Sequence, residues 1–477
     1  MLFNSLDFTV FLPIVFVLYW FVVNKNLKHQ NILIAFASYV FYGWWDWRFL
    51  ALILFSTLVD YVIGVSLGRE HNLYKRKILL WVSVLVNLGF LGFFKYYNFF
   101  LDNFKSAFTF FGSEINANSL NIILPVGISF YTFQTLSYTI DVYKRQLEPT
   151  KDFISFAAFV SFFPQLVAGP IERATNLLPQ FNIKRKFNYT QGVDGMRLIL
   201  WGMFKKVVIA DNCAFAVNDI FANYGTASGM ELILGAIFFA FQIYGDFSGY
   251  SDMAIGTAKL FGFDLMINFR TPYFSRDIAE FWRRWHISLS TWFRDYVYIP
   301  LGGSRVSKNR GVINIFVVFM LSGFWHGANW TFVVWGSLNA LYFLPLLLSG
   351  RNRKDLGSVA EGRTLPNFKE LVQMVLTFSF TCLAWVFFRS DTVADAINYI
   401  FRIFVFTSFN TSALLSHAKI ITLISIFLLF EWRGRADRFP LYFKNSILRR
   451  LSYATILLLI VFFGLYISPN SFIYFQF

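Results

Sequence analysis

The feature that most constrains this chain is a succession of apolar segments, repeated from residue 8 to residue 467. A helix needs about 20 mostly apolar residues to cross the hydrocarbon layer of a membrane. The composition agrees, because 56% of the 477 residues are hydrophobic and only 14% are charged, whereas soluble domains carry about a quarter charged residues. The sequence therefore predicts an all-α polytopic membrane protein. No long polar linker interrupts it, so residues 1–477 are expected to form a single integral-membrane domain.

The net charge of +15 would suggest a nucleic-acid partner in a soluble protein. Here the lysines and arginines gather in loops between apolar segments, a pattern typical of cytoplasmic loops. We therefore expect contact with membrane lipid and none with nucleic acid. The two cysteines, Cys213 and Cys382, lie in apolar surroundings and indicate neither a disulfide framework nor a metal site.

The basic loops predict about eleven membrane spans, with both termini outside the cytoplasm. The first apolar run, residues 8–23, is followed by polar residues and not by a small-residue cleavage site, so we expect it to be a retained span. Residues 153–168 are different, since basic residues flank them on both sides and Pro164 interrupts them. This pattern predicts a re-entrant segment, whose backbone must be shielded from lipid by protein or water.

The apolar runs at about 311–324 and 329–348 predict a hairpin with His326 at its turn. His326, in the segment LSGFWHGANW (321–330), is the first candidate for chemistry. An ionisable side chain at membrane depth is costly and is by default a functional-site candidate. Imidazole is also suited to moving protons near neutral pH. The structural alternative is a buried histidine that only bonds a backbone carbonyl.

The segment FWRRWHISLSTWFRDYVYIPLGGSR (281–305) is the second strong feature. At helical spacing, Trp282, His286 and Ser290 fall on one face. One interpretation is an interfacial helix with snorkelling arginines. The other is a basic mouth for a phosphorylated carrier from the cytoplasm, since guanidinium groups suit phosphate. The candidate donor-binding residues are Trp282, Arg283, Arg284 and Arg294.

Two histidines in tryptophan-rich motifs, His286 and His326, suggest a site for proton transfer. A metal site is not expected, because no third histidine lies near and the acids Glu280 and Asp295 are plausible salt-bridge partners of the arginines.

Other polar residues give weaker signals. Asp246 lies in a glycine- and serine-rich segment that could be a broken or tightly packed helix. Asp246 could orient a histidine or hold a substrate hydroxyl, or only bond a nearby serine. Asn329, close to His326 in sequence, is a second supporting candidate. Lys205 and Lys206 are expected to snorkel to the cytoplasmic interface.

Four motifs together carry a resemblance to a known family. They are LPVGISFYTFQTLSYTIDVYK (124–144), FFPQLVAGPIER (162–173), the 281–305 segment and LSGFWHGANW. The chain resembles the bacterial branch of the membrane-bound O-acyltransferases, and more narrowly the alginate O-acetyltransferase type. The resemblance covers essentially the whole chain, to the closing SPNSFIYFQF (468–477).

The resemblance implies a ring of about eleven transmembrane helices with re-entrant segments around a central tunnel. It implies that His326 is the signature catalytic residue and His286 the second characteristic polar position. The donor would be cytoplasmic acetyl-CoA, a substrate and not a bound cofactor. The acceptor would be an extracytoplasmic acetyltransferase or esterase-like partner protein, which completes transfer to polysaccharide hydroxyls. The expected location is the bacterial inner membrane.

Acyl transfer to a hydroxyl needs a base, and a histidine supplies one. We expect His326 to be the general base, and His286 to polarise the donor carbonyl or position the thioester. A covalent acyl-histidine is also possible.

Three alternatives stay open. The D-alanyl transferases of teichoic acid export share the histidine pair and use a carrier-protein thioester, although YIPLGGSR (298–305) resembles the acetyltransferase branch better. Broken helices with buried acids would also suit a transporter. A catalytically dead scaffold is the third alternative, and both histidines argue against it.

Overall fold

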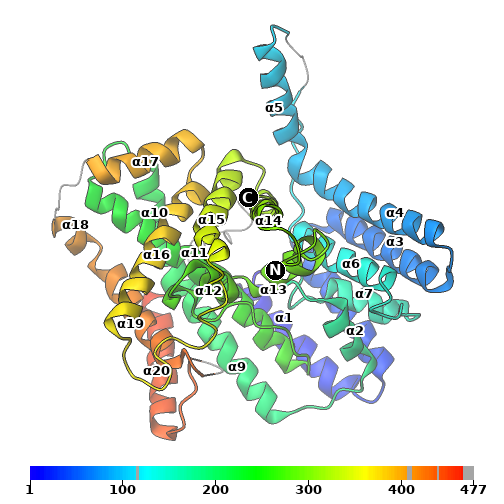
Figure 1. Cartoon of the computed structure of the whole chain (residues 1–477). Helices are drawn as coiled ribbons and strands as arrows, with labels where there is room; N and C mark the ends of the chain where they lie inside the picture. Colours follow the sequence, from blue (N-terminus) through cyan, green and yellow to red (C-terminus); the bar gives the residue numbers. More distant parts are fainter. Residues whose placement is uncertain (114–117, 406–410, 438–439, 466–477) are drawn as a thin grey trace. The chain divides into compact units, whose positions relative to one another are not determined.

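The computed structural model describes residues 1–113, 118–405, 411–437 and 440–465. Every regular element in these ranges is a helix, which confirms the all-α prediction (Figure 1). The closing motif at 468–477 lies outside the described residues. The chain divides into two compact units, one comprising Met1–Met196 and Ala254–Met266, the other Arg197–Met253 and Ile267–Phe477.

The first unit contains helices from the N-terminal part of the chain. They are α1 (Leu6–Val17), η1 (Leu18–Val22), α2 (Leu27–Gly43), η2 (Trp47–Phe49), α3 (Leu50–Arg69), α4 (Leu73–Leu91), η3 (Gly92–Tyr96), α5 (Tyr97–Phe110), α6 (Ile128–Tyr143), α7 (Phe153–Ser161), α8 (Ala174–Leu177) and η4 (Leu178–Asn182). Two further helices, α9 (Tyr189–Phe204) and α11 (Gly229–Leu260), contribute residues to both units.

The second unit contains the remaining helices. They are η5 (Lys205–Ala210), α10 (Asp211–Ala222), η6 (Pro272–Phe274), α12 (Ile278–Arg284), α13 (Ile287–Phe293), η7 (Arg294–Tyr298), α14 (Lys308–His326), α15 (Trp330–Leu348), α16 (Phe368–Arg389), α17 (Val393–Val405), α18 (Thr411–Ser416), α19 (Ala418–Gly434) and α20 (Ser446–Phe463).

Six helices in the described part of the chain are long and apolar enough to cross a membrane. They are Trp47–Arg69, Leu73–Phe110, Gly229–Leu260, Trp330–Leu348, Phe368–Arg389 and Ser446–Phe463. This confirms a multi-pass membrane protein, while the expected count of about eleven spans stays a prediction. The helix Gly229–Leu260 is an interior one, because 89% of its most apolar window is buried, against 17% for Ser446–Phe463.

Polar side chains tie α3, α4 and α6 together in the first unit. Asp60 of α3 is fully buried and accepts hydrogen bonds from Ser83 Oγ (2.5 Å), Asn87 Nδ2 (2.9 Å) and Thr139 Oγ1 (3.2 Å). Buried polar groups are costly unless they are hydrogen-bonded. Here the donors come from two neighbouring helices, so the carboxyl group fixes how the three helices pack.

The predicted re-entrant segment forms a short helix, α7, followed by a buried non-helical stretch through residue 170. Other helices satisfy its backbone, since Ser38 Oγ accepts from the N–H of Phe163 (3.0 Å) and Gln134 Nε2 donates to the carbonyl of Phe159 (2.8 Å). Such shielding is what irregular backbone inside a membrane requires. Whether the segment enters and leaves on one membrane face stays a prediction.

Tryptophans form the centre of the second unit. Trp285, Trp335 and Trp385 are each 1% exposed, and Trp385 lies 5.1 Å from Trp285 and 5.5 Å from Trp335 between ring centroids. They come from the end of α12, from α15 and from α16. Large aromatic side chains dominate packing energetics when buried, so this cluster fixes the residue that follows Trp285 in the chain.

Candidate active site

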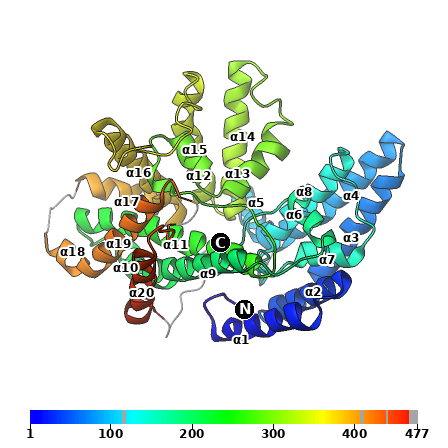
Figure 2. The same ribbon diagram turned by 90° about the horizontal axis from the view of Figure 1, so that it is seen from below.

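His326 is the last residue of α14, the first helix of a hairpin with α15 (Figure 2). Glycines let the two helices approach closely. A Cβ on Gly323 would overlap the carbonyl oxygen of Phe332, and a Cβ on Gly336 would overlap that of Phe319. The hairpin predicted from the two apolar runs is confirmed, and its close packing buries His326 to 3% exposure.

His286 occupies a sharp turn between α12 and α13. The sequence predicted one continuous helix here, and that prediction is wrong. The N–H of Ile287 donates to the backbone carbonyl of Asn268 (2.9 Å), and the N–H of Ser288 donates to Asn268 Oδ1 (3.2 Å). These amides would otherwise bond the preceding helical turn, so the helix is interrupted and His286 takes a left-handed conformation (φ 42°, ψ 55°). The helical face predicted for Trp282 and His286 therefore does not form.

The structure brings the two histidines together. The ring centroids of His286 and His326 lie 6.4 Å apart. Trp325 contacts both rings, at 6.1 Å from His286 and 5.0 Å from His326. Trp335 and Phe388 each lie 5.3 Å from His326. The pair is thus enclosed by aromatic rings, a surrounding of low polarity in which charge–dipole interactions are strengthened.

His286 is held on one edge by polar groups and on its faces by phenylalanines. Its Nδ1 lies 3.1 Å from Asn268 Oδ1, while its ring packs against Phe247 (4.6 Å) and Phe269 (6.3 Å). Nε2 is buried without a hydrogen-bond partner among the described residues. His286 lies outside the six candidate spans, and burial lowers its pKa to about 3. The imidazole is therefore neutral at physiological pH.

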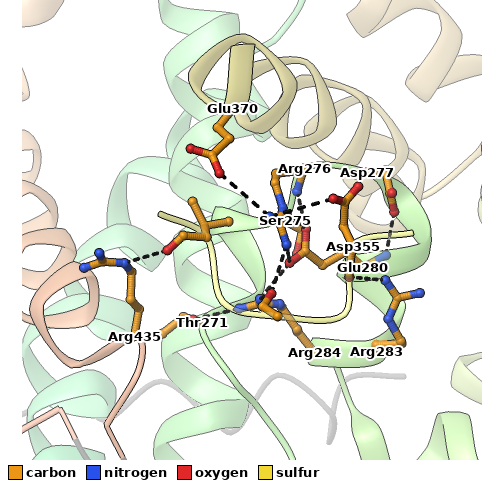
Figure 3. Close-up of polar contacts among 12 residues, drawn as sticks. Thr271, Ser275, Arg276, Asp277, Glu280, Arg283, Arg284, Asp355, Glu370 and Arg435 are labelled. Carbon is orange, nitrogen blue, oxygen red and sulfur yellow. Dashed lines mark hydrogen bonds and ion pairs between the residues drawn. The ribbon is translucent and has the colours of Figure 1, made fainter. Parts of the chain in front are cut away.

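Two of the three arginines predicted to bind a donor, Arg283 and Arg284, have internal partners (Figure 3). Arg283 donates to the backbone carbonyls of Asn352 and Asp355, both at 2.7 Å. Arg284 donates to Glu280 Oε1 at 2.6 Å. The contacts of Arg283 connect α12 to the segment that follows α15, and the contact of Arg284 lies within α12. Donor binding by these side chains stays a prediction, and the contacts indicate that they also hold the local fold.

Glu280 is the centre of this ion-pair network. Its carboxylate is 1% exposed and accepts from Arg276 (3.0 Å) as well as Arg284 (2.6 Å), which Figure 3 shows converging on it. Arg276 also lies 3.8 Å from carboxylate oxygens of Asp355 and Glu370. The prediction that the nearby acids pair with the arginines is confirmed for Glu280.

Arg294 and Trp282 lie in different environments. Arg294 pairs with Asp295 at 2.6 Å, which confirms the second predicted partner, and its side chain is 58% exposed. Trp282 Nε1 donates to Asn339 Oδ1 (3.2 Å), and its ring packs against Trp335 (5.7 Å). Arg294 is therefore the donor-binding candidate whose guanidinium group is open to solvent, and it lies beside its partner Asp295.

Asn329 caps a helix. Its Oδ1 accepts from the N–H of Thr331 (3.0 Å) at the start of α15, and its Nδ2 donates to the carbonyl of Asp391 (2.9 Å). These bonds stabilise the turn after His326 and connect it to the end of α16.

Asp246 lies in an unbroken helix, α11, which packs closely on η5. It accepts from Lys206 (2.8 Å), which also pairs with Asp211 (2.9 Å), while Lys205 pairs with Asp252 (2.7 Å). Both lysines are buried, so the expectation that they snorkel to the interface is wrong. Burial favours neighbouring carboxylates as their partners, because an unpaired charge would be far more costly there.

No group of three histidine, cysteine, aspartate or glutamate side chains that could hold a metal ion occurs in the described ranges.

Known proteins are similar in sequence to this chain over most of its length. A sequence profile of "MBOAT, membrane-bound O-acyltransferase family" matches residues 144–387, a region that contains both histidines. The "Probable alginate O-acetylase AlgI" of Pseudomonas syringae is 38% identical over 452 residues, covering 94% of this chain and 84% of the relative. The chain belongs to the membrane-bound O-acyltransferase family. It is an O-acyltransferase of the membrane, and the transporter and scaffold alternatives lose their support.

Other family members are similar over shorter stretches. The "Peptidoglycan O-acetyltransferase" of Helicobacter pylori is 36% identical over 427 residues, covering 83% of this chain and 78% of the relative. The "Teichoic acid D-alanyltransferase" of Bacillus subtilis is 28% identical over 283 residues, covering 56% of this chain and 69% of the relative. Membership thus implies an acyl donor, and these relatives are named for polymers.

Sequence reasoning missed Asn268 and the role of Trp385. Asn268 lies in a loop segment with no recognisable motif, and only folding brings it to His286. Trp385 was one tryptophan in an apolar run, and its place in the aromatic cluster depends on packing between helices.

Proposed function

We propose that this enzyme moves an acetyl group from cytoplasmic acetyl-CoA across the membrane to an extracytoplasmic acceptor. The observation that carries the proposal is the buried pair of His286 and His326, 6.4 Å apart inside an aromatic enclosure. The names of the relatives, an alginate O-acetylase and a peptidoglycan O-acetyltransferase, support acetyl as the group transferred.

In this proposal His326 is the general base. The acceptor hydroxyl oxygen attacks the carbonyl carbon of the thioester, and His326 takes the hydroxyl proton as the new ester bond forms. The bond from carbon to sulfur breaks, and the leaving thiolate takes up the proton held by His326, which returns the imidazole to its neutral form. His286 is a supporting residue that polarises the donor carbonyl or positions the thioester.

The donor is proposed to approach from the basic cytoplasmic segment that holds Arg283, Arg284 and Arg294. Guanidinium groups suit phosphate geometry, and the pyrophosphate of coenzyme A is doubly charged. Arg294 supports this best, because its side chain is 58% exposed. Trp282, Asp246 and Asn329 are proposed to support the site through the contacts described above.

We further propose that all 477 residues form one acyltransferase domain, with about eleven spans and re-entrant segments around a tunnel. The protein would lie in the bacterial inner membrane with both termini extracytoplasmic. Its acceptor would be an extracytoplasmic acetyltransferase or esterase-like protein that serves envelope polysaccharide hydroxyls. The basic loops and the names of the relatives support this assignment.

The test is turnover of labelled acetyl-CoA by purified protein in nanodiscs, with His326→Ala compared with wild type. We expect turnover to fall by at least about 100-fold, the usual contribution of a positioned acid–base group. His71→Ala is the matched control, because His71 is an exposed histidine, and it should keep full activity. Full activity in His326→Ala would remove this residue from the chemistry.

A D-alanyl carrier-protein thioester is the alternative donor, supported by the teichoic acid relative. It would be supplied next if acetyl-CoA gives no turnover. Turnover with the carrier thioester alone would replace acetyl transfer with D-alanyl transfer and leave the role of His326 to the same variant.

A further inference from the structure

We propose that Asn268 is a positioning residue that holds His286 as the Nδ1–H tautomer, so that its Nε2 presents a lone pair to the site. This inference deepens the proposed function and, for its catalytic consequence, rests on it. It assigns a role to a residue outside the histidine motifs, and it decides what kind of hydrogen bond His286 can make with a substrate.

The hydrogen-bond donors around Asn268 determine how its side-chain amide is oriented. The backbone N–H of Ser288 can only donate, and it lies 3.2 Å from the atom assigned as Oδ1. The hydroxyl of Ser288 donates to the same atom at 2.9 Å. An amide NH₂ group in this position would face a backbone N–H, donor against donor. The atom that meets His286 is therefore the oxygen.

The oxygen of Asn268 determines which ring nitrogen of His286 carries the proton. An amide oxygen is only an acceptor, so Nδ1 of His286, at 3.1 Å, must carry the proton. The other polar contact of Nδ1, to Ser288 Oγ, is longer at 3.4 Å. A neutral imidazole has one N–H, and Nε2 is then an acceptor. The hydrogen-bond partners of Nδ1 in the described part of the chain, Asn268 and Ser288, are uncharged, so they do not stabilise a second proton on the ring.

Asn268 also holds the backbone and the ring of His286 in place. Asn268 is fully buried, and its backbone carbonyl accepts from Ile287 while its side chain accepts from Ser288 and His286. It therefore bonds three consecutive residues of the turn. His286 itself has a φ of 42°, a region in which an L side chain is strained and which persists only where surrounding contacts enforce it. Asn268 supplies those contacts and fixes the ring.

The tautomer of His286 determines which hydrogen bonds its Nε2 can make. This atom is buried without a partner in the described ranges, and its ring lies beside His326. An acceptor nitrogen takes a hydrogen bond from a substrate O–H or N–H. It does not polarise a thioester carbonyl, because that requires an N–H on the same side. Of the roles expected for His286, the tautomer thus favours positioning the substrate over polarising its carbonyl.

The tautomer is tested first in the wild-type protein. Long-range ¹H–¹⁵N spectra of protein labelled at its histidine side chains report which ring nitrogen carries the proton, and His286→Gln identifies the signals. We expect Nδ1 to be protonated in wild type and in Asn268→Asp, which keeps an acceptor oxygen, and a mixed population in Asn268→Ala. A protonated Nε2 in wild type would overturn the proposal, and this measurement needs no variant of Asn268 to fold.

Turnover is tested second. We expect Asn268→Ala to lower kcat by about 10- to 100-fold, the range seen when groups that orient a metal-ligating histidine are removed. Asn212→Ala is the matched control, because Asn212 is also buried and hydrogen-bonded to backbone carbonyls. It should change neither the spectra of His286 nor kcat.

Failure of this proposal is distinct from failure of the proposed function. If Asn268→Ala turns over the donor as fast as wild type, the positioning role is overturned and the proposed acyl transfer is unaffected. No turnover by wild type with either acyl donor overturns the proposed function and, with it, the catalytic role of Asn268, whereas the spectra still decide the tautomer.

Discussion

At the scale of single residues, burial and hydrogen bonding decide what each histidine can do. His286 is 1% exposed, bonded to an asparagine and enclosed by phenylalanine rings. Removing a charged imidazolium from water is costly, so the folded protein keeps this ring neutral. The left-handed backbone at His286 is a strained conformation at the proposed active site, and the contacts of Asn268 enforce it.

Burial of His286 predicts how stability depends on pH. Its folded-state pKa of about 3 lies below the unfolded value of about 6.5. Between these values the unfolded chain binds a proton that the folded protein excludes. Stability is therefore complete above about pH 6.5 and falls by about 1.4 kcal/mol for each pH unit below it.

The measurement is thermal unfolding of detergent-solubilised protein from pH 7.5 to pH 5. We expect the melting temperature of wild type to fall more steeply than that of His286→Gln, which has no such proton to exclude. His71→Ala removes an exposed histidine and should follow wild type. Parallel curves for wild type and His286→Gln would contradict a buried neutral imidazole.

At the scale of helices, glycines decide how closely α14 and α15 pack, and through this where His326 lies. The carbonyl of Phe332 occupies the space that a Cβ on Gly323 would need. Because packed interiors tolerate extra atoms poorly, the two helices would have to separate. His326 follows Gly323 within one helical turn, so separation would move it away from His286.

We therefore expect Gly323→Ala to destabilise the protein by about 1–3 kcal/mol, as overpacking does, and to lower acyl turnover. Thermal unfolding and labelled-donor turnover check both. Gly311→Ala in the same helix is the control, because nothing lies within 4 Å of its added Cβ. It should be neutral or stabilising by up to about 1 kcal/mol. Equal effects of the two substitutions would show that helix propensity, and not close packing, governs the hairpin.

At the scale of the whole molecule, each unit buries ionisable groups and supplies them with polar or charged partners. The first unit surrounds Asp60 with hydroxyl and amide donors. The second unit pairs Lys205 and Lys206 with carboxylates. Such partners are what buried ionisable groups need in a chain with six apolar helices of spanning length.

The distribution of basic loops predicts the orientation of the chain in the membrane. We expect Asn4→Cys to be extracytoplasmic, and Lys25→Cys and Lys354→Cys to be cytoplasmic. Lys25 and Lys354 are exposed. A membrane-impermeant maleimide added to intact cells should label Asn4→Cys alone, and should label all three after permeabilisation. The native Cys213 and Cys382 are buried, so wild type is the background control. Labelling of Lys25→Cys in intact cells would reverse the orientation.

Sequence by itself determined the class of the protein, the family and the hairpin that carries His326. These follow from local patterns: apolar length, the positions of basic residues, and motifs that lie in one stretch of chain. The same patterns gave the salt-bridge partners of the arginines, because Glu280 and Arg284 are one helical turn apart.

Only the tertiary structure decided the turn at His286, the partners of Lys205 and Lys206, and the part played by Asn268. Helical spacing predicted one helix carrying Trp282, His286 and Ser290, but the amides of Ile287 and Ser288 bond Asn268 instead. A competing hydrogen bond from a distant segment leaves no trace in local periodicity. The lysines were expected to reach water for the same reason, since a sequence does not reveal that carboxylates of another helix will be within 3 Å.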